Sequence, residues 1–197
     1  MLMKSDIFEY GKWICPQKLA DLTSIDVYSP QLRKEEEKPS QELKNLRFYV
    51  RKRFNISQAG SRTHIRVSAD DYYKLYINGS FVGQGPAQGY YTCYYWNEFD
   101  VTSFIKDGEN EIRADVYYQG LINRAYQSGD RRIGFIAELY SGENCILHTD
   151  SSWESAFING YAPSHIIGLN TMFSEDFDGR AGISGWQTCS EIVTDHI

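Results

Sequence analysis

Five aromatic side chains fall within a short stretch of this 197-residue sequence: Tyr90, Tyr91, Tyr94, Tyr95 and Trp96. Flat rings can stack on the apolar face of a pyranose, so the stretch is a candidate sugar-binding platform with Tyr90, Tyr91, Tyr95 and Trp96 as contact residues. The alternative is structural, with alternate rings filling a core and the others covering its edge. The second arrangement is the commoner one in β-proteins, and the sequence leaves both open.

A long polar loop, residues 119–132, lies between two predicted strands and carries Asn123, Arg124 and Asp130. Loops between the strands of a β-sandwich carry most of the binding functions of that architecture. We therefore add Asn123, Arg124 and Asp130 to the candidate carbohydrate-binding residues.

An acidic cluster near the end of the chain contains Glu175, Asp176 and Asp178. If residues 172–178 form a late edge strand, alternation places Asp176 and Asp178 on one face, about 6.5 Å apart. Paired carboxylates near that separation could serve a glycosidase or hold calcium. Acidic residues on an outward strand face are far commoner, and Arg180 can neutralise them. We assign no catalytic residue to this chain.

Other motifs point away from cofactor chemistry. The glycine-rich stretch 83–89 lacks the dinucleotide-binding fingerprint, because Gln88 stands at a glycine position and no helix is predicted after it. We interpret it as a loop that leaves a hairpin strand. The four cysteines and four histidines are scattered, without the spacing of a metal site. We predict no metal and no cofactor.

The elements that must position these residues read as strands. Apolar and polar residues alternate with a period of two, which is typical of half-buried strands. The predicted strands cover residues 46–56, 63–69, 72–77, 111–118, 133–140 and 144–149. Asn78-Gly79 favours a tight type I′ hairpin turn, and Asp100 can cap a short helical turn. Short strands separated by turns predict an antiparallel sandwich rather than a parallel sheet.

The composition and charge of the chain limit its expected domain organisation, partners and location. We expect an irregular N-terminal arm and charged loop at 1–45, a β-sandwich at 46–188, and a tail at 189–197 toward a downstream domain. A net charge of −6 argues against a nucleic-acid partner, and the basic run Arg47–Arg53 reads as the solvated face of a strand. No long apolar run or secretory signal is visible in this sequence, so we expect no membrane partner and a cytoplasmic location.

Two longer stretches carry a resemblance to a known family. They are 68–86, Ser-Ala-Asp-Asp-Tyr-Tyr-Lys-Leu-Tyr-Ile-Asn-Gly-Ser-Phe-Val-Gly-Gln-Gly-Pro, and 99–112, which opens Phe-Asp-Val-Thr. With 50–54 and with 175–180 followed by Trp186, they resemble the N-terminal β-sandwich domain of bacterial α-L-rhamnosidases, glycoside hydrolase family 78. The resemblance covers roughly residues 46–188. It implies an all-β, antiparallel, jelly-roll-like sandwich of the galactose-binding-domain type.

The same resemblance implies a catalytic (α/α)6 barrel, which this sequence is too short to contain. We therefore expect a non-catalytic accessory domain of a longer α-L-rhamnosidase-like enzyme, with that barrel as its partner and with some tendency to self-associate. One alternative is an autonomous carbohydrate-binding module, for which a rhamnose-containing oligosaccharide would be a partner. Another is a small hydrolase that uses Asp176 and Asp178.

Overall fold

The computed structural model describes residues 7–25, 41–57, 62–90, 93–121, 128–161, 165–168 and 172–192. The elements of the first half are β1 (Ile14–Pro16), η1 (Gln17–Leu19), η3 (Gln41–Leu43), β2 (Leu46–Ile56), β3 (Thr63–Asp70), β4 (Tyr72–Ile77), β5 (Ser80–Gly85), β6 (Asn97–Asp100) and η4 (Thr102–Phe104). Those of the second half are β7 (Gly108–Tyr118), β8 (Gly134–Ser141), β9 (Asn144–His148), β10 (Glu154–Phe157), β11 (Ile166–Ile167), β12 (Met172–Phe173) and β13 (Gln187–Glu191). The η elements are short 3-10 turns, and the described residues include no helix that could span a membrane.

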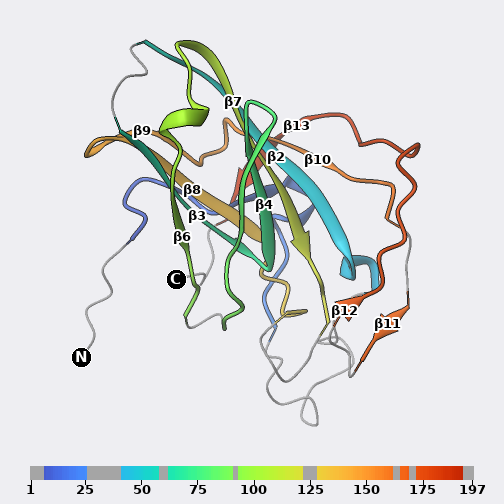
Figure 1. The fold of residues 1–197 in the computed structure, drawn as a ribbon. Helices are drawn as coiled ribbons and strands as arrows, with labels where there is room; N and C mark the ends of the chain where they lie inside the picture. The colour runs from blue at the N-terminus through green and yellow to red at the C-terminus, as the bar shows by residue number, and fades with distance from the viewer. Residues whose placement is uncertain are drawn as a thin grey trace, which may run out of the picture.

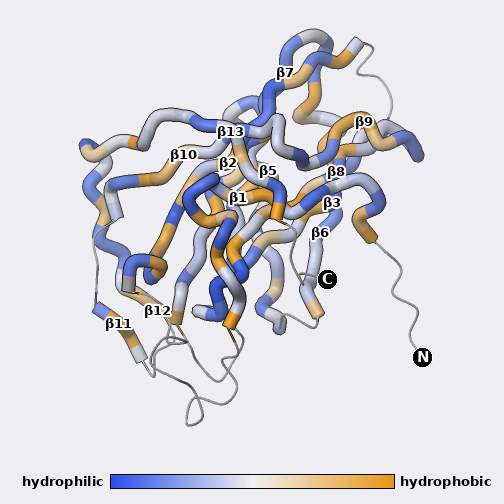
Figure 2. The backbone as a smooth tube through the Cα atoms, turned by 180° about the vertical axis from the view of Figure 1, so that it is seen from behind, coloured by the Kyte–Doolittle hydropathy of each residue, from blue (hydrophilic) through white to orange (hydrophobic). Residues whose placement is uncertain are grey.

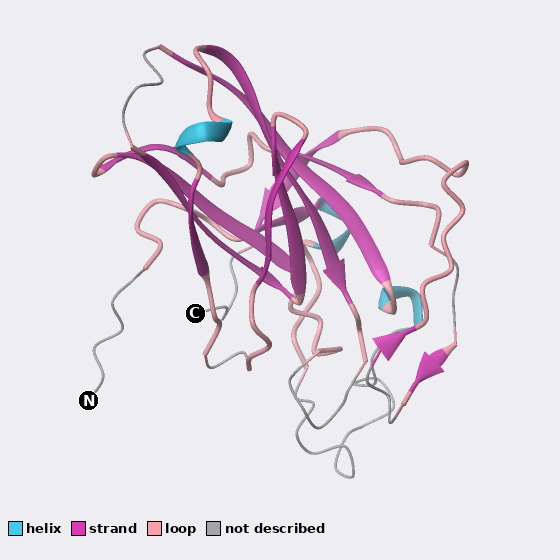
Figure 3. Ribbon diagram, in the orientation of Figure 1, coloured by secondary structure: helices cyan, strands magenta, loops and turns pink. Residues whose placement is uncertain are grey.

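The strands form two layers of antiparallel sheet, as Figures 1 and 3 show. One layer runs β5-β4-β7-β2-β10 and the other runs β1-β8-β3-β6, with β9 beside β8. β13 pairs with both β10 and β1 and so joins the layers. The chain crosses between them at Asp70-Asp71, where β3 ends and β4 begins. The expected all-β antiparallel sandwich is confirmed.

The core lies between the layers, and the predicted alternation selects its residues. Figure 2 shows hydrophobic and hydrophilic residues alternating along the strands. Tyr73 packs edge-on against Phe135 of the other layer, with ring centroids 6.3 Å apart. The inward residues of the central strands are all almost fully buried, and they include Phe48, Val50, Ile65, Val67, Leu75, Ile77, Ile112, Ala114 and Val116. Burial on this scale removes large apolar areas from water and holds the layers together.

The predicted turns form as expected. Asn78 and Gly79 both have positive φ, and Ile77 pairs with Ser80 across a two-residue turn. Asp100 Oδ1 accepts hydrogen bonds from the Thr102 amide at 3.0 Å and the Thr102 hydroxyl at 2.7 Å. Asn110 Oδ1 accepts from Asn78 Nδ2 at 2.8 Å. These side chains of the family-like motifs therefore serve the fold locally.

The glycine-rich stretch leaves the hairpin strand β5, as interpreted. A Cβ atom at Gly85 would lie 2.1 Å from Asn97 Oδ1 and 3.1 Å from the Tyr73 hydroxyl. Only glycine lets the β5 backbone approach β6 this closely.

The first and last segments enter the sheet to an extent that the sequence pattern did not reveal. Ile14–Pro16 forms β1, which pairs with Cys189–Glu191 of β13 and with β8. The boundary expected at 188/189 therefore falls inside a strand. The expected edge strand at 172–178 was wrong in extent: β12 is Met172–Phe173, and among the described strands it pairs with β11 alone, as a separate ribbon.

Candidate functional site

The outward side of β4, β7 and β2 carries tyrosine and arginine side chains in place of the usual small polar residues. Tyr72 and Tyr117 lie nearly parallel, with centroids 6.2 Å apart and an interplanar angle of 18°. The Arg113 guanidinium lies over the rings of both Tyr49 and Tyr76, at 5.0 and 5.3 Å. We call this outward side of β4, β7 and β2 the cleft face.

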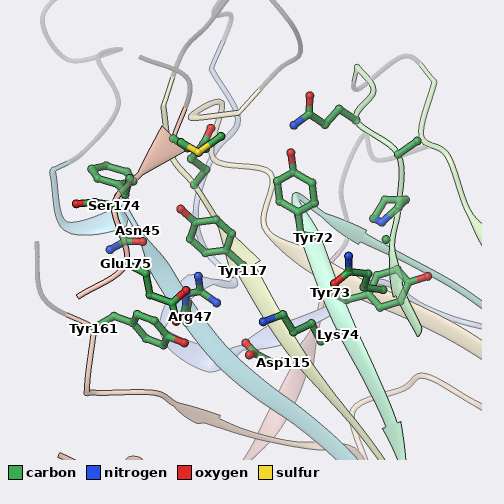
Figure 4. Close-up of a pocket in the computed structure, with 18 of the residues that line it drawn as sticks. Asn45, Arg47, Tyr72, Tyr73, Lys74, Asp115, Tyr117, Tyr161, Ser174 and Glu175 are labelled. Carbon is green, nitrogen blue, oxygen red and sulfur yellow. The ribbon is translucent and has the colours of Figure 1, made fainter. Parts of the chain in front are cut away.

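A cleft of about 530 Å³ opens on this face (Figure 4). Its floor is formed by the sheet, and residues from other parts of the chain form its walls. The floor residues are Arg47, Tyr72, Lys74, Asp115 and Tyr117, and the wall residues include Gln84, Pro86, Gln88, Tyr161, Phe173, Ser174 and Glu175. The volume lies within the roughly 300–1,000 Å³ that is typical of small-molecule sites.

Arg47 sits between two aromatic rings at one end of the cleft. Its guanidinium carbon is 4.2 Å from the centroid of Tyr117 and 4.1 Å from that of Tyr161. The buried Arg47 Nε has no hydrogen-bond partner among the residues that the structure describes. Stacking on two rings holds the guanidinium in place without using its in-plane donors. Figure 4 shows Glu175 on the same side of the cleft.

Asp115 supplies an acceptor on the cleft floor. It lies opposite Lys74 in the β4–β7 ladder. No residue in the described part of the chain hydrogen-bonds to its buried Oδ1. Burial raises the pKa of the Asp115 carboxyl, and the charges of Arg47 and Lys74 oppose that rise. Within the described residues, the floor thus presents one buried donor and one buried acceptor without a hydrogen-bond partner. Such groups are few in native proteins, and each calls for an explanation.

A second group of carboxyls lies under the cleft wall where β3 turns into β4. Asp71 Oδ2 accepts hydrogen bonds from the backbone amide of Gln119 at 2.7 Å and from the Ser128 hydroxyl at 2.6 Å. Asp70 accepts a hydrogen bond from the Tyr94 hydroxyl. Burial raises the pKa of Asp71 to about 6, and burial together with the neighbouring Asp71 raises the pKa of Asp70 well above its usual range.

The predicted aromatic platform lies apart from this cleft. Tyr90, Tyr95 and Trp96 are exposed at 38%, 51% and 37%, and none of them lines the cleft. Tyr94 is instead half-buried and packs against Trp13 with centroids 5.3 Å apart. Among the described rings of this stretch, only Tyr94 is partly covered, and the neighbouring Tyr95 and Trp96 are both exposed, so covered and exposed rings do not alternate. Sugar binding by Tyr90, Tyr95 and Trp96 stays a prediction.

The other candidate residues from the sequence are either not described or engaged within the fold. Tyr91, Asn123 and Arg124 lie outside the described residues. Asp130 is buried, and its Oδ2 accepts a hydrogen bond from Arg132 Nη1 at 2.8 Å. The buried Asp130 is thus engaged by a neighbour in the fold, and its role as a sugar contact also stays a prediction.

The cleft residues were missed because they stood on the solvated side of predicted strands. Tyr72, Lys74, Asp115 and Tyr117 all occupy outward positions. Large aromatic residues at outward positions were the available signal. The Arg47–Arg53 run likewise does not all face water, because Tyr161 covers Arg47 and Trp186 lies 3.7 Å from the Arg51 guanidinium.

Fold and cleft together define a β-sandwich domain with a ligand-sized hollow on one outer face. A family model described as the α-L-rhamnosidase N-terminal domain matches residues 58–194. The chain therefore belongs to the α-L-rhamnosidase N-terminal domain family. A comparison with curated proteins finds no match.

Solved rhamnosidases share the fold. The family 78 rhamnosidase of Bacillus sp. GL1 matches with a TM-score of 0.73 and 21% identity, over 92% of this chain and 18% of that one. The α-L-rhamnosidase of Dictyoglomus thermophilum gives 0.62 and 20%, over 99% and 22%. That of Aspergillus terreus gives 0.61 and 20%, over 98% and 22%. This chain thus spans about a fifth of the length of the solved structures it matches.

Proposed function

We propose that this chain is a non-catalytic accessory domain of an α-L-rhamnosidase-like glycoside hydrolase, which packs on and supports a catalytic (α/α)6 domain of the same protein. The family match over residues 58–194 carries the proposal. The chain's share of about a fifth of the solved rhamnosidases supports it, since a larger catalytic domain fits within the rest.

An exposed apolar ribbon supports a packing role. Ile166, Ile167 and Met172 of β11 and β12 are exposed at 43%, 49% and 52%. Apolar side chains gathered on a small projecting element are typical of surfaces that another domain covers.

The state of the acidic cluster supports a non-catalytic role. Arg180 donates to both carboxylate oxygens of Asp178, each at 2.8 Å, and these hydrogen bonds lower the pKa of Asp178. A general acid for glycoside hydrolysis needs a raised pKa, so Asp178 is poorly suited to that role. Asp176 is not aligned with it on a strand, because β12 ends at Phe173.

The test uses the longer protein that contains this chain. Ile167→Asp and Met172→Asp are expected to lower the Tm of the catalytic domain while kcat on p-nitrophenyl α-L-rhamnopyranoside is retained. Ile146→Asp, at an exposed isoleucine on β9, is the matched control and leaves that Tm unchanged. Turnover of the rhamnoside by this chain alone would contradict the non-catalytic role, and an unchanged Tm in both ribbon variants would contradict packing through the ribbon.

A further inference from the structure

We propose that Asn159 and Gly160 form a site of spontaneous deamidation, where the folded chain converts an asparagine into aspartate or isoaspartate. The pair lies in the turn that follows β10. The Gly160 nitrogen attacks Cγ of Asn159, and ammonia leaves with the proton of the Gly160 N–H, so that a cyclic succinimide forms. Water then opens the ring at either carbonyl. Neither residue belongs to the β11–β12 ribbon or lines the cleft, so this chemistry is separate from the packing role.

The sequence contains two matched steps of this kind. Ile77-Asn78-Gly79 and Ile158-Asn159-Gly160 consist of the same three residues, and they hold the two Asn-Gly pairs of the chain. Glycine favours the reaction in both, because it has no Cβ to hinder the approach of its own nitrogen. The local sequence therefore treats the two asparagines alike, and the fold decides which of them reacts.

The fold holds Asn78 through both ends of its side-chain amide. Asn78 Nδ2 donates hydrogen bonds to Phe104 O at 2.9 Å and to Asn110 Oδ1 at 2.8 Å. Asn78 Oδ1 accepts a hydrogen bond from Glu111 N at 3.0 Å. Ring closure requires the amide to turn toward the following nitrogen and to give up these three hydrogen bonds. Deamidation at Asn78 is therefore suppressed while the chain stays folded.

Asn159 has the same sequence neighbours in a different environment. Its side chain is exposed, and no described residue forms a hydrogen bond with its amide group. The backbone is paired on either side of the reacting atoms, since Asn159 N donates to Gly182 O at 3.2 Å and Asp178 N donates to Gly160 O at 2.8 Å. Within the described part of the chain, no group accepts from Gly160 N. The attacking nitrogen and the attacked amide are both available, and exposure lets water reach the succinimide.

The isoaspartate product changes the length of the backbone. Its main chain runs through the former side-chain Cβ, which adds one carbon atom to the link between two antiparallel bridges. One bridge pairs Ile158 with Ile183, and the other pairs Tyr161 with Phe177. The longer link shifts one bridge relative to the other, so pairing in this turn is lost. The isoaspartyl chain is therefore expected to have a lower Tm than the unmodified chain.

The test incubates the folded 197-residue chain in mildly alkaline buffer, where the glycine nitrogen loses its proton more readily. Samples are digested at acidic pH, and mass spectrometry follows the peptides that contain Asn78 and Asn159. Deamidation at Asn159 is expected to be at least about tenfold faster than at Asn78, because three hydrogen bonds must first be broken at Asn78.

Two controls separate the fold from the sequence and the charge from the backbone change. In guanidinium chloride the chain keeps its sequence and loses its fold, so the two Ile-Asn-Gly steps should react at similar rates. Asn159→Asp introduces the carboxylate without the extra backbone atom, and its Tm is expected to stay at the wild-type value. The isoaspartyl chain, separated from the incubated sample by ion exchange, is expected to melt below both.

Three outcomes would overturn the proposal. The first is a folded chain in which Asn159 deamidates no faster than Asn78. The second is a rate ratio that guanidinium chloride leaves unchanged, because the sequences and not the fold would then set it. The third is an isoaspartyl chain with the Tm of Asn159→Asp, which would show that the turn accepts the longer backbone without loss of pairing.

Discussion

Two outward-facing carboxyls, one on each layer of the sandwich, differ in how completely the fold hydrogen-bonds them. Glu138 on β8 is fully buried and accepts hydrogen bonds from the Tyr10 amide at 2.6 Å, the Gly11 amide at 2.7 Å and the Tyr140 hydroxyl at 2.5 Å. Asp115 on β7 has a buried oxygen, Oδ1, to which none of the described residues donates a hydrogen bond. Both residues lie on central strands of their layers.

The difference separates a carboxylate that stabilises the fold, Glu138, from one whose hydrogen-bonding capacity the fold does not use in full, Asp115. The N-terminal segment covers Glu138 and satisfies its oxygens, so the carboxylate fastens that segment to β8. The cleft face leaves Asp115 beside a hollow of about 530 Å³, and no described residue hydrogen-bonds to its Oδ1. A buried acceptor without a partner is expected to cost stability. A buried carboxyl is therefore informative only together with its hydrogen-bond partners.

The largest effect is expected from Glu138→Ala. The substitution leaves the Tyr10 and Gly11 amides and the Tyr140 hydroxyl without their acceptor, and it should cost about 3 kcal/mol or more of unfolding free energy. Urea denaturation measures the loss, and limited proteolysis should show faster cleavage near residue 10. Glu98→Ala, at an exposed carboxylate on β6, is the control and should cost under about 1 kcal/mol. Equal losses in the two variants would contradict the structural role of Glu138.

The second effect is a dependence of stability on pH that arises from a third set of carboxyls, Asp70 and Asp71. Their pKa values are raised in the folded state, that of Asp71 to about 6. A raised pKa in the folded state favours folding at low pH, and that contribution disappears as pH rises through the folded value. The shift of Asp71 alone predicts a loss of up to about 3 kcal/mol between pH 4 and pH 7.

Unfolding free energies measured from pH 4 to pH 8 test this sign. Asp71→Asn should flatten the curve, because the asparagine can still accept from Gln119 and Ser128 but does not titrate. A stability that instead rises steadily from pH 4 to pH 7 in the wild-type chain would show that these carboxyls are ionised without penalty.

Most of the layered fold was predictable, because local sequence determines it. Alternation along residues 46–56 and 111–118 identified the inward side chains, and Asn78-Gly79 fixed a hairpin turn through its positive φ values. β1 was missed because three residues that include a proline carry no periodic signal, and only pairing with β13 and β8 makes them a strand.

The candidate site was not predictable to the same degree, because residues far apart in the sequence create it. Arg47 and Asp115 look like ordinary solvated positions until Tyr161 and Glu175 form the wall of a cleft above them. Glu138 looks equally ordinary until Tyr10 and Gly11 cover it. Nothing in the spacing of either carboxyl says which one the fold satisfies.

The third prediction concerns the stability of the Asp115→Asn variant. Removing a partly desolvated charge whose Oδ1 has no partner in the described part of the chain should leave the unfolding free energy unchanged or raise it by up to about 1 kcal/mol. Thermal and urea denaturation at pH 7 measure the change, and Glu111→Gln serves as the reference. A loss of more than about 1 kcal/mol would mean that Asp115 supports the fold as Glu138 does. The two carboxyls would then not differ in their contribution to stability.

The smallest effect is expected from Arg66→Gln, on the outward side of β3. Arg66 pairs with Glu98 at 3.1 Å and lies over Tyr140 at 4.9 Å and Trp96 at 5.8 Å. Its side chain and that of Glu98 are 32% and 40% exposed, so solvent screens the pair and the loss should be under about 1 kcal/mol. The loss should shrink further in 1 M salt, where the Debye length is about 3 Å. A salt-independent loss as large as that of Glu138→Ala would instead place the anchoring of this face in the Arg66 stack, because only buried contacts escape such screening.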